Sequence, residues 1–157
     1  MKMTLFRLSK ESVIGNVKIT VDGDTVSFNL HRETRINRNN LDQELEEHPA
    51  KYSYALTILA AIDSKLEEMD TKRKNIEAKL SEEFATSKES SYYKKAQKFP
   101  AAKLIDNLVR NHKKYRSIQE EYADLRTNRA KINALCRGLE EKSRMLQTLS
   151  ANLRKNQ

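Results

Sequence analysis

The chain has 157 residues and a formal charge of +8, with 38% hydrophobic and 33% charged residues but only three glycines and two prolines. This length allows one domain with an appendage, and the scarcity of helix breakers favours long helices over disorder. One cysteine, Cys136, excludes an internal disulfide and indicates a reducing compartment. No apolar run reaches the roughly 18 residues of a membrane span, and residues 1–15 lack a secretory apolar core. We therefore expect a cytoplasmic protein without a membrane segment.

The first predicted element is a β-hairpin in residues 17–30, VKITVDGDTVSFNL. Apolar residues alternate with polar ones on both sides of Asp22-Gly23, a dipeptide typical of tight hairpin turns. Residues 4–8 would add a third strand. Because an isolated hairpin is marginal in water, it should pack on a helix or on a neighbouring subunit. We assign residues 1–35 to an N-terminal appendage and residues 36–157 to a helical domain.

Two helices are predicted after a polar, basic linker at residues 31–40. Asn39 or Asn40 would cap a short helix at 41–47, and Pro49 would open a long helix that ends near Ser87. An apolar stripe at spacings of three and four residues indicates a coiled-coil seam along the long helix. Its members are Tyr52, Leu56, Leu59, Ile62, Leu66, Met69, Ile76, Leu80 and Phe84.

The last long helix is predicted from near Pro100 to Arg154, with a seam of the same kind. If the two long helices fold into an antiparallel hairpin about residue 92, Arg73 lies level with Asn111 and the two form a polar layer in the seam. The predicted fold is therefore mainly α, a long antiparallel helical hairpin with a small N-terminal β-hairpin and an overhanging C-terminal helix.

The overhang covers residues 136–155, which extend beyond the predicted partner helix. An apolar stripe without a partner must be buried on something. The 41–47 helix, the β-hairpin and other subunits can all cover it, and we favour contacts between subunits in a homo-oligomer. The residues expected in that interface are Leu139, Leu146, Leu149 and Leu153.

Charge is distributed unevenly along the chain. Residues 41–87 carry −5, from six basic and eleven acidic residues, whereas residues 88–116 carry +7, from nine basic and two acidic residues. Within the basic segment, residues 90–103 read SSYYKKAQKFPAAK, with two adjacent tyrosines, a phenylalanine and four lysines. Such a segment is either a solvated turn or a surface for a polyanion.

Single-stranded nucleic acid is the polyanion that this combination favours, because basic side chains meet phosphates and aromatic rings stack on bases. Tyr92 and Phe99 can equally plug the end of the helical hairpin, but two adjacent tyrosines cannot easily both face inward. Arg110, Lys113 and Lys114 would share one helix face. The candidate DNA-binding residues are Lys88, Tyr92, Tyr93, Lys94, Lys95, Lys98, Lys103, Arg110, Lys113 and Lys114.

No pattern in the sequence indicates catalysis, a metal or a cofactor. The three histidines, His31, His48 and His112, are far apart and lack metal-ligand spacing. There is no glycine-rich phosphate loop and no nucleophile elbow. We expect a protein that is not an enzyme and has no catalytic, metal-binding or cofactor-binding residues.

Residues 36–58, INRNNLDQELEEHPAKYSYALTI, resemble the T4-type phage recombination mediators, the UvsY-like family. The likeness lies in the acidic D-x-x-x-L-type segment before Pro49, the Lys51-Tyr52 pair that opens a long helix, and the later Tyr92-Tyr93 pair. It extends over about residues 36–155, although Tyr92-Tyr93 follows IEAKL at 76–80 later than in the family, and the β-hairpin has no family counterpart.

The resemblance implies a non-enzymatic mediator that assembles as a ring through its C-terminal region. Such a protein binds single-stranded DNA, contacts the single-strand-binding protein and helps a RecA-like recombinase to assemble, here in the host cytoplasm if the protein is phage-encoded. Two alternatives stay open. One is a coiled-coil structural or assembly protein without DNA affinity, and the other is an architectural protein that prefers duplex DNA.

Overall fold

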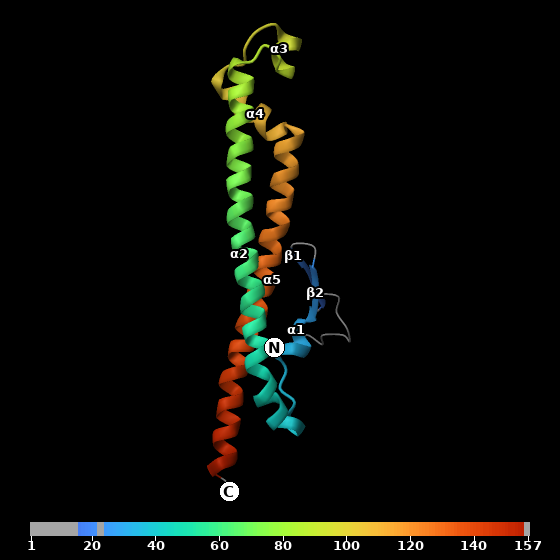
Figure 1. Cartoon of the computed structure of the whole chain (residues 1–157), viewed down its shortest axis with the longest axis vertical. Helices are drawn as coiled ribbons and strands as arrows, with labels where there is room; N and C mark the ends of the chain where they lie inside the picture. Colours follow the sequence, from blue (N-terminus) through green and yellow to red (C-terminus); the bar gives the residue numbers. More distant parts are fainter. Residues whose placement is uncertain (1–15, 22–23, 156–157) are drawn as a thin grey trace, which may run out of the picture. The chain divides into compact units, whose positions relative to one another are not determined.

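The computed structural model describes residues 16–21 and 24–155 and is mainly α-helical, as predicted (Figure 1). The predicted strand at 4–8 and the Asp22-Gly23 turn lie outside the described residues. The elements are β1 (Asn16–Val21), β2 (Asp24–Asn29), α1 (Leu30–Thr34), the 3-10 helix η2 (Arg38–Asn40), α2 (Leu41–Thr86), α3 (Ser91–Ala96), α4 (Ala102–Asn111) and α5 (Lys113–Lys155).

The predicted hairpin is confirmed as an antiparallel pair in which Val17 lies opposite Phe28 and Ile19 opposite Val26. Asn29 ends the second strand and begins a helix that was not predicted. The side-chain Nδ2 of Asn29 donates to Asn16 Oδ1 at 2.7 Å, while its side-chain Oδ1 accepts from the backbone N–H of Arg32 at 3.0 Å. This capping bond turns the chain directly from β2 into α1, so the expectation of a linker starting at residue 31 was wrong.

Helix α2 is continuous from Leu41 to Thr86, so the predicted separation into two helices at Pro49 was wrong. Proline in a helix removes one backbone hydrogen bond and normally costs about 3 kcal/mol. Pro49 itself is exposed, and the helix continues through it with His48 and Ala55 buried on either side along the chain. The predicted end of the helix near Ser87 is confirmed.

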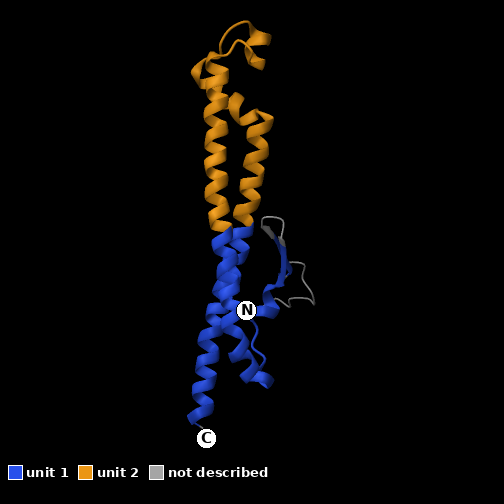
Figure 2. Cartoon of the chain, viewed as in Figure 1, with its two compact units in different colours: residues 1–61, 128–157 blue, residues 62–127 orange. Residues whose placement is uncertain are grey.

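The chain divides into two compact units (Figure 2). Unit 1 comprises residues 1–61 and 128–157, and unit 2 comprises residues 62–127. Helices α2 and α5 each contribute to both units. The β-hairpin belongs to the same unit as the first part of α2 and the last part of α5, and the domain boundary between residues 35 and 36 stays a prediction.

Unit 2 is built around a cluster of Leu80, Phe84 and Val109, which come from α2 and α4. The predicted single closing helix is interrupted at His112, whose backbone is extended with a ψ of 133°. The His112 ring packs edge-on against Phe84 with centroids 6.2 Å apart, and its Nδ1 accepts a hydrogen bond from the Lys114 N–H at 3.3 Å. His112 thus ends α4 and caps α5, because its side chain both packs and accepts.

The predicted polar layer of Arg73 and Asn111 is absent from the described residues of unit 2. Arg73 pairs with Asp70 at 2.7 Å and lies 5.4 Å from the ring centroid of Tyr122. Asn111 is exposed, and its side-chain amide donates to the Asn107 carbonyl of its own helix. The predicted register between the two long helices assumed an uninterrupted closing helix. Because the chain breaks at His112, that register does not apply.

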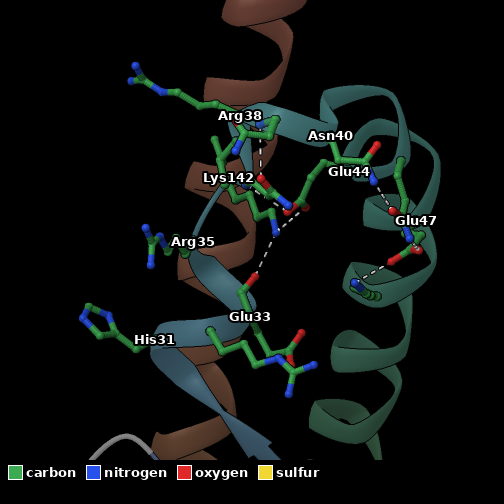
Figure 3. Close-up of a pocket in the computed structure, with 14 residues that line it drawn as sticks. His31, Glu33, Arg35, Arg38, Asn40, Glu44, Glu47 and Lys142 are labelled. Carbon is green, nitrogen blue, oxygen red and sulfur yellow. Dashed lines mark hydrogen bonds and ion pairs between the residues drawn. The ribbon is translucent and has the colours of Figure 1, made fainter. Parts of the chain in front are cut away.

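Unit 1 is held together by a buried lysine that the stripe analysis did not include. Lys142 of α5 is 3% exposed, and its ammonium donates to Glu44 Oε2 of α2 at 2.7 Å and to the Glu33 carbonyl of α1 at 3.1 Å (Figure 3). Burial raises the pKa of Glu44, but the hydrogen bonds from Lys142 and from the Asn37 N–H outweigh it and lower the pKa below 4.5. The Lys142 ammonium thereby links α5 to both α2 and α1.

The C-terminal stripe is largely covered within the chain. Leu139 and Leu146 are buried, Leu149 is half-buried and Leu153 is 54% exposed. At the start of α2 the predicted seam was displaced, because Leu56 is exposed while Ala55, its neighbour in the same turn, is buried. The unit 1 core contains Val17, Ile19, Ala55, Ile58, Ile132, Leu135, Cys136, Leu139 and Leu146.

Gly138 marks a close approach between α5 and α1. A Cβ atom at position 138 would overlap the Thr34 Cγ2 methyl group. In an ordinary helix, glycine to alanine stabilises by about 1 kcal/mol. We expect Gly138→Ala to lower the free energy of unfolding instead, as measured by urea denaturation. Adding Thr34→Ser, which removes that methyl group and keeps the hydroxyl, should restore stability; a stable single variant would contradict the close contact.

His48 is buried, and its ring stacks on that of Tyr52 with centroids 6.2 Å apart. Burial, helped by the nearby Lys142 charge, lowers the pKa of His48 below its ordinary value of 6.5. The unfolded chain therefore takes up this proton more readily than the folded chain does.

The free energy of unfolding should accordingly fall as the pH decreases from 6.5 toward the lower pKa of the folded state. We expect urea denaturation between about pH 7.5 and 5.5 to show this loss in the wild type and a smaller loss in His48→Leu. His31→Gln, which alters an exposed histidine, serves as the control and should keep the wild-type pH dependence. An unchanged slope in His48→Leu would contradict the assignment.

Candidate nucleic-acid interface

The basic segment folds into a short helix that was predicted only as a loop. Ser90 is fully buried, and its hydroxyl accepts a hydrogen bond from the Tyr93 N–H at 3.2 Å, which caps α3. Gln97 ends the helix in the left-handed conformation, with a φ of 56°, and its N–H donates to the Tyr93 carbonyl at 2.7 Å. Hydrogen bonds at both ends therefore define the path of the segment between α2 and α4.

The three aromatic rings divide between core and surface. Tyr92 packs against the Leu80, Phe84 and Val109 cluster. Tyr93 pairs with Phe99 at a centroid distance of 4.7 Å, and Phe99 remains 42% exposed. The interpretation of Tyr92 as a plug is thus supported, whereas Tyr93 and Phe99 form an aromatic pair that reaches the surface. Such a pair is suited to stacking on a base.

The predicted basic residues all belong to unit 2, and every one of them is exposed. We call this set, with the ring pair, the basic–aromatic surface. Among the described residues, only Lys94 of this set has a carboxylate partner, Glu89 at 2.7 Å, and that pair lies in solvent. The Lys94 ammonium lowers the pKa of Glu89. The cationic members are Lys88, Lys94, Lys95, Lys98, Lys103, Arg110, Lys113 and Lys114.

The basic residues of α2 in the same unit are arranged differently. Lys65 and Lys72 both bind Glu68, while Arg73 and Lys74 both bind Asp70. The hydrogen bonds from Lys72 and Lys65 lower the pKa of Glu68 to about 2. Four of the five basic residues of this α2 segment therefore share two carboxylates at spacings of three and four residues, while Lys79 is exposed without a carboxylate partner in the described residues. In the basic–aromatic surface only Lys94 has such a partner, so most of its positive charge faces solvent.

One detail of the predicted surface was wrong. Arg110 does not share a helix face with Lys113 and Lys114, because the chain is extended at His112 between α4 and α5. Arg110 lies in the last turn of α4, and the two lysines begin α5. A single helical periodicity therefore cannot relate them.

The four leucines predicted for oligomerisation are not all available to another subunit. Leu139 and Leu146 are covered within the chain, whereas Leu153 is exposed. Exposed Tyr54, Leu56 and Met145, all in unit 1, were not among the predicted interface residues. The expectation of a homo-oligomer stays a prediction.

Unit 1 contains an open polar cavity of about 1020 Å³ between the 31–44 segment and the first turns of α2 (Figure 3). Two of its lysines are already paired, Lys142 with Glu44 and Lys51 with Glu47. Figure 3 shows His31, Arg35 and Arg38 directed away from those pairs. The cavity is thus mainly a product of the ion pairs that hold α1 and α2 to α5.

Within the described part of the chain, no group of three or more histidine, cysteine or carboxylate side chains could hold a metal ion. The same residues contain no helix that is long and apolar enough to cross a membrane. Comparison with protein-family models, with curated proteins and with solved structures found no match. The functional interpretation therefore depends on the charges, rings and cavities of this chain.

The cap on α3 should order the basic–aromatic surface. Replacing an N-cap serine by alanine typically costs about 0.5–2 kcal/mol. We expect Ser90→Ala to accelerate amide hydrogen exchange at residues 93–96 by roughly tenfold, with the backbone of unit 1 unaffected. Ser91→Ala, which alters an exposed neighbour, is the control. Equal exchange in the two variants would show that the Ser90 hydroxyl does not hold α3.

Proposed function

We propose that this chain binds single-stranded DNA through the basic–aromatic surface and acts as a recombination mediator. The observation that carries the proposal is the contrast within unit 2 between lysines paired inside α2 and exposed lysines beside the Tyr93–Phe99 pair. Cations without a carboxylate partner bind phosphates more readily than paired ones, and binding to unstacked bases needs exposed rings.

The path of the strand follows from the elements that carry these side chains. Lys94 and Lys95 in α3, Lys98 in the following turn and Lys103 in α4 come from consecutive segments of one unit. Phosphates of one short stretch of DNA would contact these lysines while a base stacks on Phe99. No element among the described residues of unit 2 resembles a recognition helix with base-reading side chains, so the binding would be independent of sequence.

The mediator role adds partners that the resemblance to the UvsY-like family implies. In this proposal several copies of the chain assemble, so that weak contacts to one strand add by avidity. The assembly contacts the single-strand-binding protein and helps a RecA-like recombinase to form its filament. The rival function is a coiled-coil structural or assembly protein, which would have no salt-sensitive affinity for DNA.

The test is fluorescence anisotropy with a labelled single-stranded oligonucleotide and its duplex across a salt series. We expect Lys94→Gln, Lys95→Gln and Lys98→Gln together to weaken binding. The log–log salt slope should become shallower by about 0.7 for each phosphate that the variant no longer neutralises. The wild type should prefer the single strand, because duplex bases cannot stack on an exposed ring.

A matched variant has the same change in charge at Lys65, Lys72 and Lys74, which are already paired within α2. It should keep most of the wild-type affinity. Equal losses of affinity in the two variants would show a dependence on net charge alone. Absence of binding by the wild type would favour the structural protein, and equal affinity for duplex would favour an architectural one.

A further inference from the structure

Unit 2 contains a second feature that the sequence did not indicate, an open cavity of about 500 Å³. Three arginines from three different helices line it: Arg73 of α2, Arg110 of α4 and Arg116 of α5. Tyr115 completes one wall, and Glu77 and Glu120 also contribute. Convergence of three guanidinium groups is costly unless an anion or solvent separates them.

Arg73 is held in place on two sides. Its Nη2 binds Asp70 at 2.7 Å, and its guanidinium carbon lies 5.4 Å from the Tyr122 ring centroid. The Asp70 carboxylate, with a smaller contribution from the Tyr115 hydroxyl, raises the pKa of Arg73. The group is therefore charged and oriented before any ligand arrives.

One donor of this oriented group is not used. The Nε of Arg73 is buried and has no hydrogen-bond partner among the described residues. Buried donors are nearly always paired, and donors on charged groups are the most costly to leave alone. Protein atoms cover this Nε, so a ligand in the cavity would meet the rest of the guanidinium group, which a phosphate or carboxylate oxygen matches best.

Arg110 and Arg116 reach the same cavity because of the break at His112. Arg110 precedes it in the last turn of α4, and Arg116 follows it in the first turn of α5, where its N–H donates to the His112 carbonyl at 3.0 Å. Both side chains are exposed, and neither has a carboxylate partner within the described part of the chain. A continuous helix would have separated them differently.

We propose that this cavity binds one phosphate group of a single-stranded nucleic acid, held by Arg73, Arg110 and Arg116. The inference rests on the proposed function and adds a defined subsite to it. Arg110 belongs both to the cavity and to the basic–aromatic surface, which makes the ligand a phosphate of the same strand.

The planar fork of arginine distinguishes this subsite from a diffuse positive surface. Lysine keeps the charge but loses bidentate hydrogen bonding to phosphate. We expect Arg116→Lys to weaken single-stranded DNA binding by about tenfold, as measured by anisotropy at constant salt. Arg126→Lys, at another exposed arginine of α5, is the control and should bind like the wild type.

A second measurement follows the Arg73 guanidinium directly. On titration with a thymidine trinucleotide, the Nε–H signal of Arg73 in a proton–nitrogen spectrum should shift as phosphate binds to the same guanidinium group. If the wild type binds the strand but Arg116→Lys is unaffected and the Arg73 signal stays in place, the subsite is overturned and the proposed function stands. If the wild type does not bind the strand at all, the proposed function fails and the subsite with it.

Discussion

The buried ammonium of Lys142 is the interaction on which unit 1 depends. A lysine that is 3% exposed is stable only when its donors are satisfied, and Glu44 and the Glu33 carbonyl satisfy two of them. Removal of one partner of a buried pair typically costs about 3–5 kcal/mol, because the remaining charge is left uncompensated. The same unit contains the close approach of Gly138 to Thr34, and the Lys142 charge adds to the effect of burial in lowering the pKa of His48.

In unit 2 most of the charged side chains are exposed, whereas Lys142 in unit 1 is buried. The α2 segment of unit 2 pairs four of its five basic residues with Glu68 and Asp70, whereas the α3–α4 segment leaves most of its lysines without carboxylate partners in the described residues. Surface ion pairs contribute little to stability, so the pairs in α2 matter less for folding than for removing positive potential from that helix. Basic side chains without carboxylate partners thereby gather near Phe99, Arg110 and Arg116, whereas the third cavity arginine, Arg73, lies on α2 and pairs with Asp70. The proposed DNA binding depends on this uneven distribution of charge.

The sequence predicted the regular features well, because periodicity is a local property. The alternation around Asp22-Gly23 indicated the hairpin, and spacings of three and four residues indicated long helices ending near Ser87. The errors occurred where a side chain contacts something distant in sequence. His112, whose ring packs on Phe84, breaks the closing helix, and α2 continues through the exposed Pro49 although proline normally ends a helix. Neither feature can be read from a local pattern.

The candidate site shows the same division. Composition alone located the lysines and the tyrosine pair at residues 88–114, since an excess of positive charge is visible in a sequence. Charge, helical content and the hairpin were thus determined by the sequence itself. Only the tertiary structure decided that Tyr92 is core while Phe99 is exposed, that Arg73 meets Tyr122 instead of Asn111, and that Arg110 and Arg116 share a cavity. The physical reason is that the burial of a ring, the register of two helices and the convergence of side chains on one cavity all depend on which helices touch. In unit 2 the break at His112 sets those contacts.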